Sequence, residues 1–193
     1  NLFEMGLSSG DSPELWNETE PTKVKMLHKS FVEAGSEIIL TNSFGANSSR
    51  LKLHGAGRRA YEISKISAEL AREIADQSSN KIAVAGSIGP TGEILSPIGD
   101  FKTEFATEIF HEQAEGLRDG GVDVLWLETI SSEEEFRAAA TAFANFDLAW
   151  CGTMSFDTSG RTMMGITSSK MATLVNSGVC SPLAFGANCG AGA

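Results

Sequence analysis

The chain has 193 residues, of which 41% are hydrophobic and 21% charged, a composition that supports one folded domain and argues against disorder. Its net charge of −10 argues against a nucleic-acid or anionic-membrane partner, and no apolar run approaches the length of a membrane span. The cysteines, Cys151, Cys180 and Cys189, are odd in number and widely spaced, which argues against a disulfide framework and predicts a cytoplasmic protein.

Segments of helical periodicity alternate along the chain with short, nearly continuous apolar runs. The periodic segments predict helices, and the apolar runs predict strands that are buried on both faces. In chain order they are helix 22–34, strand 37–44, helix 57–77, strand 82–89, helix 102–118, strand 122–129, helix 132–145, strand 149–156, helix 168–177 and strand 183–190. Ser131–Glu134 and Ser132–Glu135 match a doubled capping box at the start of helix 132–145.

This alternation predicts a parallel sheet covered by helices, either an open doubly wound sheet or a (β/α)8 barrel. The open sheet would carry a dinucleotide fingerprint or a phosphate-binding loop with a lysine, and the sequence has neither. The Gly-rich stretch GSIGPTG (86–92) is interpreted as a tight strand-to-helix loop. We therefore expect an α/β fold of the TIM-barrel type, incomplete in this chain because only about five strands are predicted.

Polar residues stand where the predicted strands end, which is the edge where parallel α/β folds place their functional groups. Glu128 ends the run VDVLWLE and is either satisfied by neighbouring N–H groups or reserved for a cation such as a substrate ammonium. Cys189 lies at the end of the last run and, taken alone, is better explained as a small buried hydrophobe than as a ligand. Asn42 and Asn188 occupy equivalent strand-end positions.

A tryptophan and three histidines are further candidates for a site. Trp16, in the polar stretch SPELWNE, is interpreted as a loop residue that forms either a lid over the core or one wall of a cation–π cage. The histidines, His28, His54 and His111, fall in or near helices, so neither a His-based metal site nor a Cys–His nucleophilic pair is predicted.

Six stretches resemble the homocysteine S-methyltransferase family, closest to its bacterial betaine–homocysteine type, and they occur in the family's order. They are GLSSGDSPELWN (6–17), AGSEIILTNSFGANSSRL (34–51), GSIGPTGE (86–93), GGVDVLWLETISSEEE (120–135), CGTMSFDTSGRTMMG (151–165) and FGANCG (185–190). The resemblance implies that residues 1–193 form a homocysteine-binding barrel domain, truncated at both ends to about strands two to six.

The resemblance also assigns roles to residues. The family binds zinc through three cysteines, and Cys189 matches the first of them, while the Gly-Gly-Cys-Cys motif that holds the other two is absent. Glu128 matches the glutamate that binds the homocysteine ammonium, and Asn188 and Asn42 are expected beside it in the substrate site. Trp16 matches a tryptophan that contacts betaine in animal enzymes, which carry a tyrosine where this chain has Gly45.

The function implied is zinc-dependent methyl transfer from an onium donor, glycine betaine first, to the homocysteine thiol, forming methionine. Its partners are small molecules, and oligomerisation is left open. Alternatives within the family are an S-methylmethionine-dependent enzyme or the homocysteine-binding module of a cobalamin-dependent methionine synthase. Alternatives outside it are a catalytically incomplete fragment with a binding or structural role, and another barrel enzyme such as an aldolase, which would need a strand-end lysine that this sequence lacks.

Overall fold

The computed structural model describes residues 1–157, 159–178 and 181–190, and over these residues one parallel sheet organises the chain. Its strands are β1 (Ile38–Leu40), β2 (Ala83–Ile88), β3 (Val124–Ile130), β4 (Ala149–Met154) and β5 (Ala184–Ala187). They lie side by side in chain order, and each neighbouring pair is parallel. A doubly wound sheet reverses its strand order partway, so the sequential order favours the barrel-type arrangement that the sequence predicts.

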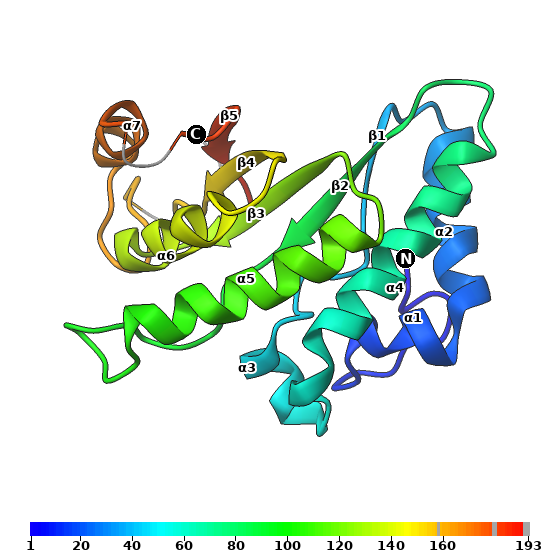
Figure 1. Ribbon diagram of the computed structural model, residues 1–193, viewed down its shortest axis with the longest axis horizontal. Coiled ribbons are helices and arrows are strands. Elements are labelled where there is room, and N and C mark those ends of the chain that lie inside the picture. The colour runs from blue at the N-terminus through cyan, green and yellow to red at the C-terminus, as the bar shows by residue number, and fades with distance from the viewer. Residues whose placement is uncertain (158, 179–180, 191–193) are drawn as a thin grey trace.

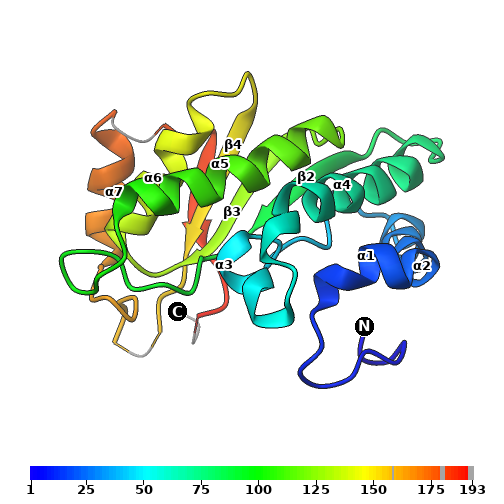
Figure 2. The same cartoon turned by 60° about the horizontal axis from the view of Figure 1, so that its bottom comes forward.

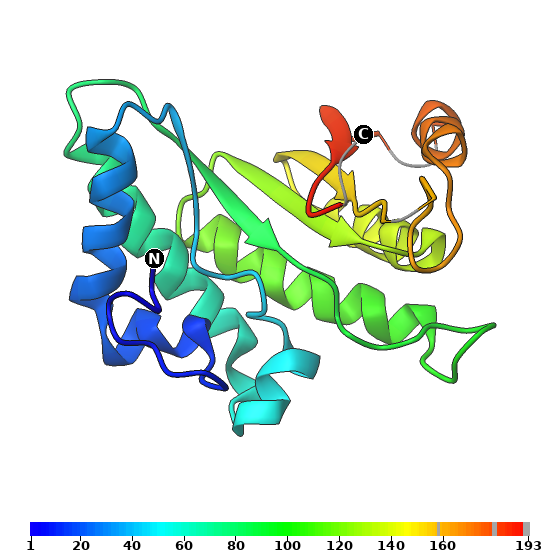
Figure 3. The ribbon, with the colours of Figure 1, turned by 180° about the vertical axis from the view of Figure 1, so that it is seen from behind.

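The helices are α1 (Trp16–Thr19), α2 (Pro21–Glu33), α3 (Ser48–Leu51), α4 (Ala60–Asp76), α5 (Thr103–Asp119), α6 (Glu133–Phe143) and α7 (Ser168–Asn176). Short 3₁₀ turns cover Pro13–Leu15, Lys52–His54 and Gly57–Arg59. Helices α4, α5 and α6 lie side by side along one face of the sheet (Figures 1 and 2), and Figure 3 shows the sheet from its other face. None of the helices over the described residues combines the length and apolar composition that crossing a membrane requires.

Most of the predicted elements are confirmed, and the differences are local. The helix predicted from residue 57 begins at Ala60, because Gly57–Arg59 form a 3₁₀ turn instead. Trp16 was expected in a loop, but it begins α1. The connection after β2 is not a tight loop, since it runs from residue 89 to residue 102 before α5 starts.

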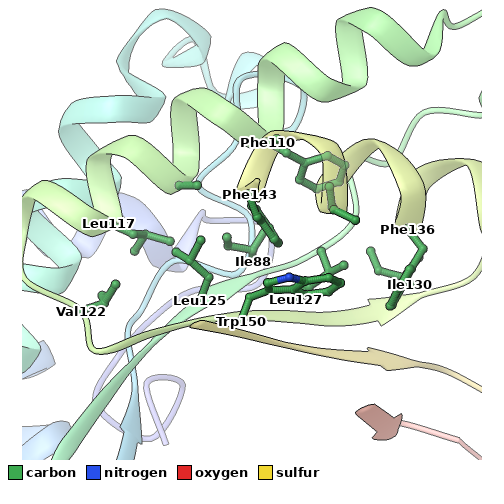
Figure 4. Packing of buried hydrophobic residues seen from close by; sticks show 14 of the residues in the cluster. Ile88, Phe110, Leu117, Val122, Leu125, Leu127, Ile130, Phe136, Phe143 and Trp150 are labelled. Atoms are coloured by element: carbon green, nitrogen blue, oxygen red, sulfur yellow. The ribbon is translucent and has the colours of Figure 1, made fainter. Parts of the chain in front are cut away.

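The main core lies between β3, β4 and the helices α5 and α6 (Figure 4). The Trp150 ring stands 5.6 Å from Phe136 and 5.5 Å from Phe143, measured between ring centroids. A Cβ at Gly152 would come within 2.8 Å of the Phe136 ring, so this strand position must be glycine for α6 to pack so closely. The other labelled side chains of this core are Ile88, Phe110, Leu117, Leu125, Leu127 and Ile130 from strands and helices, and Val122 from the connection between α5 and β3.

The capping box predicted before α6 is half correct. The Ser132 hydroxyl accepts a hydrogen bond from the Glu135 N–H at 3.1 Å, as an N-cap does. The Glu135 carboxylate does not return to Ser132; it accepts from the N–H and hydroxyl of Thr91, at 2.7 and 2.6 Å. Glu135 therefore ties the start of α6 to the loop after β2, an interaction that local sequence rules do not predict.

Candidate functional site

The carboxyl ends of four neighbouring strands bring polar side chains into one hydrogen-bonded group. Ser87 comes from β2, Glu128 from β3, Thr153 from β4, and Asn188 follows β5. The Ser87 hydroxyl donates to Glu128 Oε1 at 2.6 Å, and Asn188 Nδ2 lies 3.4 Å from Glu128 Oε2. Because the strands are parallel and adjacent, residues separated by about sixty positions in the chain meet at this edge.

A bulge in β3 re-aims the residues at the centre of this group. The register between β3 and β4 shifts between Leu127 and Ile130, and both of these side chains are fully buried in the core. Glu128 and Thr129 stand between them, half-buried, and Thr129 has a left-handed φ of 64°. For a β-branched residue this conformation costs on the order of 1–3 kcal/mol, and such strain is concentrated at functional sites. The bulge thus turns two consecutive residues of one strand away from the core.

Asn188 is the hub of the hydrogen-bonded group. Its Oδ1 accepts from the Thr129 N–H at 3.0 Å and from the Thr153 hydroxyl at 2.8 Å. Its Nδ2 lies 2.8 Å from Thr129 Oγ1 and 3.4 Å from both Glu128 Oε2 and Cys189 Sγ. An amide carries two N–H hydrogens, so it can satisfy at most two of these three acceptors at once. Asn188 therefore links the carboxylate and the thiol that the sequence singled out.

The Glu128 carboxyl has no ion-pair partner among the residues that the structure describes. Burial raises the pKa of its carboxyl, and the hydrogen bond from Ser87 opposes that rise. A half-buried carboxylate that is oriented by neutral donors and faces no cation of its own suits a cationic ligand.

Cys189 places an exposed thiol beside this carboxylate. Its backbone is left-handed, with φ of 51°, and the preceding carbonyl, that of Asn188, accepts from the Ser155 hydroxyl at 2.9 Å. A hollow of about 500 Å³ adjoins the thiol. Its walls are Phe156, Gly160, Ser168, Ala187, Asn188, Cys189 and Gly190. Cys189 is thus not the small buried hydrophobe that its composition alone suggested.

The described residues supply one metal ligand at this site. No group of three His, Cys, Asp or Glu side chains among them is arranged to hold a metal ion. Cys151 is buried within β4, and Cys180 lies outside the described residues. Catalytic zinc takes three protein ligands. Cys189 has the right chemistry for one of these ligands, but the described residues do not make a complete zinc site.

Asn42 lies at the carboxyl end of β1, but its side chain is engaged by the N-terminal segment. Its Nδ2 donates to the Pro13 carbonyl at 2.7 Å and to Asn17 Oδ1 at 3.1 Å, and Asn17 Nδ2 donates back to the Asn42 carbonyl at 2.8 Å. These bonds fasten the segment before α1 onto the sheet. A direct contact of Asn42 with substrate remains a prediction.

Trp16 lies in a separate hydrophobic cluster with Val24, Leu70 and neighbouring side chains. It is 9% exposed, and Lys23 Nζ stands 4.6 Å from the centre of its ring. The lid interpretation agrees with this packing, while a contact between Trp16 and a methyl donor remains a prediction.

Ser87 and Thr153 were not predicted as site residues from the sequence. Ser87 was visible as a polar residue near the end of an apolar run. Thr153 is buried inside β4, two positions before Ser155, so it shares a strand face with that residue. The period of two along β4 was therefore the one signal that could have pointed to Thr153.

Comparison with known proteins gives a family and a fold. A model of the homocysteine S-methyltransferase family matches residues 3–193. The methionine synthases of Mycobacterium tuberculosis (strain ATCC 25618 / H37Rv) and Mycobacterium leprae (strain TN) are 33% and 32% identical over 129 residues. That alignment covers 65% of this chain and 11% of each synthase, so the chain spans about a tenth of the length of these relatives.

Solved structures of the homocysteine methyltransferase MmuM from Escherichia coli share the fold. The metallated form has a TM-score of 0.82 at 22% identity, and the oxidized form 0.78 at 24%. Each match covers 97% of this chain and 70% of the E. coli chain. This likeness confirms the barrel-type α/β fold that the sequential strand order indicated.

Proposed function

The chain belongs to the homocysteine S-methyltransferase family, and from this premise we propose that residues 1–193 form a homocysteine-binding domain that takes part in methyl transfer to the homocysteine thiol, forming methionine. The observation that carries the proposal is the Glu128 carboxylate, held by neutral donors and joined through Asn188 to Cys189. Homocysteine carries an ammonium and a thiol on one short chain. A carboxylate and a sulfur-binding position linked by one amide match those two groups.

In this proposal Glu128 binds the substrate ammonium, and Asn188 holds the carboxylate and Cys189 in a fixed relation. The homocysteine thiol then lies near Cys189, with the hollow of about 500 Å³ available to the methyl donor. Methyl transfer is an in-line displacement, so orienting the thiol toward the donor supplies much of the rate enhancement. A thiol has a pKa of about 8.5 and must be deprotonated to act as the nucleophile.

Zinc is the proposed cofactor, with Cys189 as one of its ligands and the others from outside the described residues. The support is the exposed thiol at a strand end and the metallated form reported for the E. coli homocysteine methyltransferase. When bound, zinc favours the thiolate form of a coordinating thiol.

Glycine betaine is the donor we propose first, and S-methylmethionine is the second. Both are onium compounds, and an aromatic face attracts such a cation without an ion pair. Betaine follows from the family type that the sequence most resembles, with Trp16 as its expected contact. The covered Trp16 ring and Gly45 do not add support for betaine over a sulfonium donor.

A second candidate is the homocysteine-binding module of a cobalamin-dependent methionine synthase. It is favoured by the identity of about one third to the two mycobacterial methionine synthases. In that case the methyl group would come from methyl-cobalamin held by other domains, while Glu128 and Asn188 would keep the same roles toward homocysteine.

A donor panel tests the proposal. Purified protein with zinc and homocysteine is given betaine, S-methylmethionine, dimethylsulfoniopropionate or free methylcobalamin, and methionine is measured by mass spectrometry. We expect one onium donor to give methionine, whereas formation only with methylcobalamin would favour the second candidate. Absence of methionine with every donor would contradict both.

The zinc proposal is tested on Cys189→Ala, with Cys151→Ala as the matched control. We expect the first variant to lose bound zinc, measured by elemental analysis, and to lose activity. The second variant should keep both, because Cys151 is buried within β4. Stoichiometric zinc in Cys189→Ala would remove Cys189 from the ligand set.

A further inference from the structure

We propose that the hydroxyls of Ser87 and Thr153 are positioning groups that hold the Glu128 carboxylate ready for the substrate ammonium without contributing any charge of their own. We call this pair the hydroxyl clamp. The inference rests on the proposed binding of homocysteine by Glu128 and adds two residues through which that binding is controlled.

The first half of the clamp acts on Glu128 directly. The Ser87 hydroxyl donates to Oε1 at 2.6 Å, and the backbone of Ser87 is itself fixed by buried polar groups. Its N–H donates to Thr41 Oγ1 at 2.9 Å, and its carbonyl accepts from the Ser43 hydroxyl at 2.7 Å. Gln113 of α5 in turn donates to the Ser43 carbonyl at 2.7 Å. The carboxylate is therefore held from a rigid, buried part of the sheet.

The second half acts on Glu128 through Asn188. Thr153 and the Thr129 N–H both donate to Asn188 Oδ1, which turns Nδ2 toward Glu128 Oε2. A backbone N–H can only donate, so the reversed amide would set two donors against each other. Thr153 adds the second hydrogen bond that holds this orientation, and it never touches the carboxylate itself.

The neutrality of the clamp is what distinguishes it from an ordinary salt bridge. Glu133, a few residues further along the chain, is paired with Arg137 and Lys170, which lower the pKa of its carboxyl. A protein cation beside Glu128 would likewise neutralise its carboxylate and compete with a substrate ammonium. Hydroxyl and amide donors fix the direction of the carboxylate and leave its net charge for the ligand.

Two acceptors that differ only in the ammonium isolate this role. Steady-state methyl transfer is measured with homocysteine and with 4-mercaptobutanoate, which has the same thiol chain without the amino group. For Ser87→Ala we expect KM for homocysteine to rise about tenfold, the loss of one hydrogen bond to a charged group, with kcat nearly unchanged. KM for 4-mercaptobutanoate should stay within about twofold of the wild-type value, because this acceptor does not use Glu128.

Thr153 is tested with a disruptive and a conservative variant. Thr153→Val should raise KM for homocysteine about threefold, a smaller effect because it acts through Asn188, and Thr153→Ser should restore the wild-type value. Ser64→Ala is the matched control. Ser64 lies in α4, is also buried, and donates a hydrogen bond to the backbone carbonyl of Ala46. This variant should leave both KM values unchanged.

The outcomes distinguish failure of the hydroxyl clamp from failure of the proposed methyl transfer to homocysteine. A wild-type protein that methylates homocysteine, with Ser87→Ala raising KM equally for both acceptors or not at all, would overturn the clamp and leave the proposed function intact. Failure of Thr153→Ser to restore a KM raised by Thr153→Val would overturn the second half. A wild-type protein that binds and methylates no homocysteine would overturn the proposed function, and the clamp with it.

Discussion

Glu128 and Glu133 stand on either side of Ile130, and their surroundings give the two carboxylates different tasks. Glu133 has two cations within 3.1 Å, and its hydrogen bonds to Arg137 lower the pKa of its carboxyl. Glu128 has hydroxyl and amide donors, and its burial raises the pKa. The charge of Glu133 stabilises α6, whereas the carboxylate of Glu128 is left available for a ligand. At the scale of single residues, the partners of a carboxylate decide its role, not its position in the chain.

Glu128→Gln keeps the shape of the side chain and removes its charge. We expect KM for homocysteine to rise roughly ten- to a hundredfold, because a charge-assisted contact with the ammonium contributes about 1.5–3 kcal/mol. Thermal unfolding should show a melting temperature no lower than that of the wild type, since burial already opposes ionisation at this position.

Glu133→Gln is the matched control for that measurement. It removes a carboxylate of the same chain length that is engaged with Arg137 and Lys170, so KM for homocysteine should not change. Equal KM values for Glu128→Gln and the wild type would remove Glu128 from ammonium binding.

At the scale of elements, β3 and the α2–β1 pair show how packing overrides local pattern. The bulge in β3 interrupts the alternation of buried and exposed residues and thereby brings both Glu128 and Thr129 to the site. Helix α2 lies against β1 and buries His28, which is 4% exposed and whose Nε2 has no hydrogen-bond partner among the described residues. The imidazole is thus held where only its neutral form is tolerated.

His28 should make stability depend on pH. Its burial lowers the pKa from 6.5 to about 4, so the unfolded chain binds the proton more readily than the folded protein. Stability is then complete above about pH 6.5 and is lost as the pH falls toward 4, with a loss on the order of 2 kcal/mol by pH 5. Urea unfolding at pH 7 and pH 5 measures this difference.

His28→Leu is the comparison that isolates the histidine from the carboxylates that also titrate at low pH. The variant should lose less stability than the wild type between pH 7 and pH 5. Identical pH dependence in the two proteins would show that His28 does not carry the effect.

At the scale of the whole molecule, the sequential strand order and the acidic charge are the governing features. Parallel strands in chain order, with α4, α5 and α6 on one face, bring every strand end that carries a polar residue to the same edge. The net charge of −10 gives the molecule as a whole a negative field that repels polyanions.

The charge leads to an expected absence of nucleic-acid binding. In an electrophoretic mobility-shift assay at low salt, we expect no shift of duplex DNA or single-stranded RNA at micromolar protein, because the net charge of −10 repels the phosphate backbone. A shift that weakens with added salt would contradict this expectation. Lysozyme, a basic protein, serves as the positive control.

Much of the fold could be predicted from the sequence, because it depends on hydrophobic periodicity and on the residues that begin and end helices and strands. The apolar runs at 82–89 and 149–156 contain β2 and β4, and the run at 122–129 contains β3 except for its last residue, Ile130. Helices α5 and α6 differ from their predicted bounds by one or two residues at each end. The short α1 and α3 were missed, since four residues give too little periodicity to recognise. The reciprocal half of the capping box failed because Thr91, distant in sequence, competes for the Glu135 carboxylate.

The sequence by itself determined the family, the order of strands and helices, and the polar strand ends that include Glu128, Asn188 and Cys189. These are matters of residue type and spacing along one chain. The tertiary structure decided which of those residues meet. Ser87 is hydrogen-bonded to Glu128, and Thr129 and Thr153 are hydrogen-bonded to Asn188, across strands that are far apart in the sequence. The bulge in β3 sets the directions of Glu128 and Thr129. A pattern of period two cannot foresee an inserted residue or a hydrogen-bond partner on another strand, because both depend on the register that folding alone establishes.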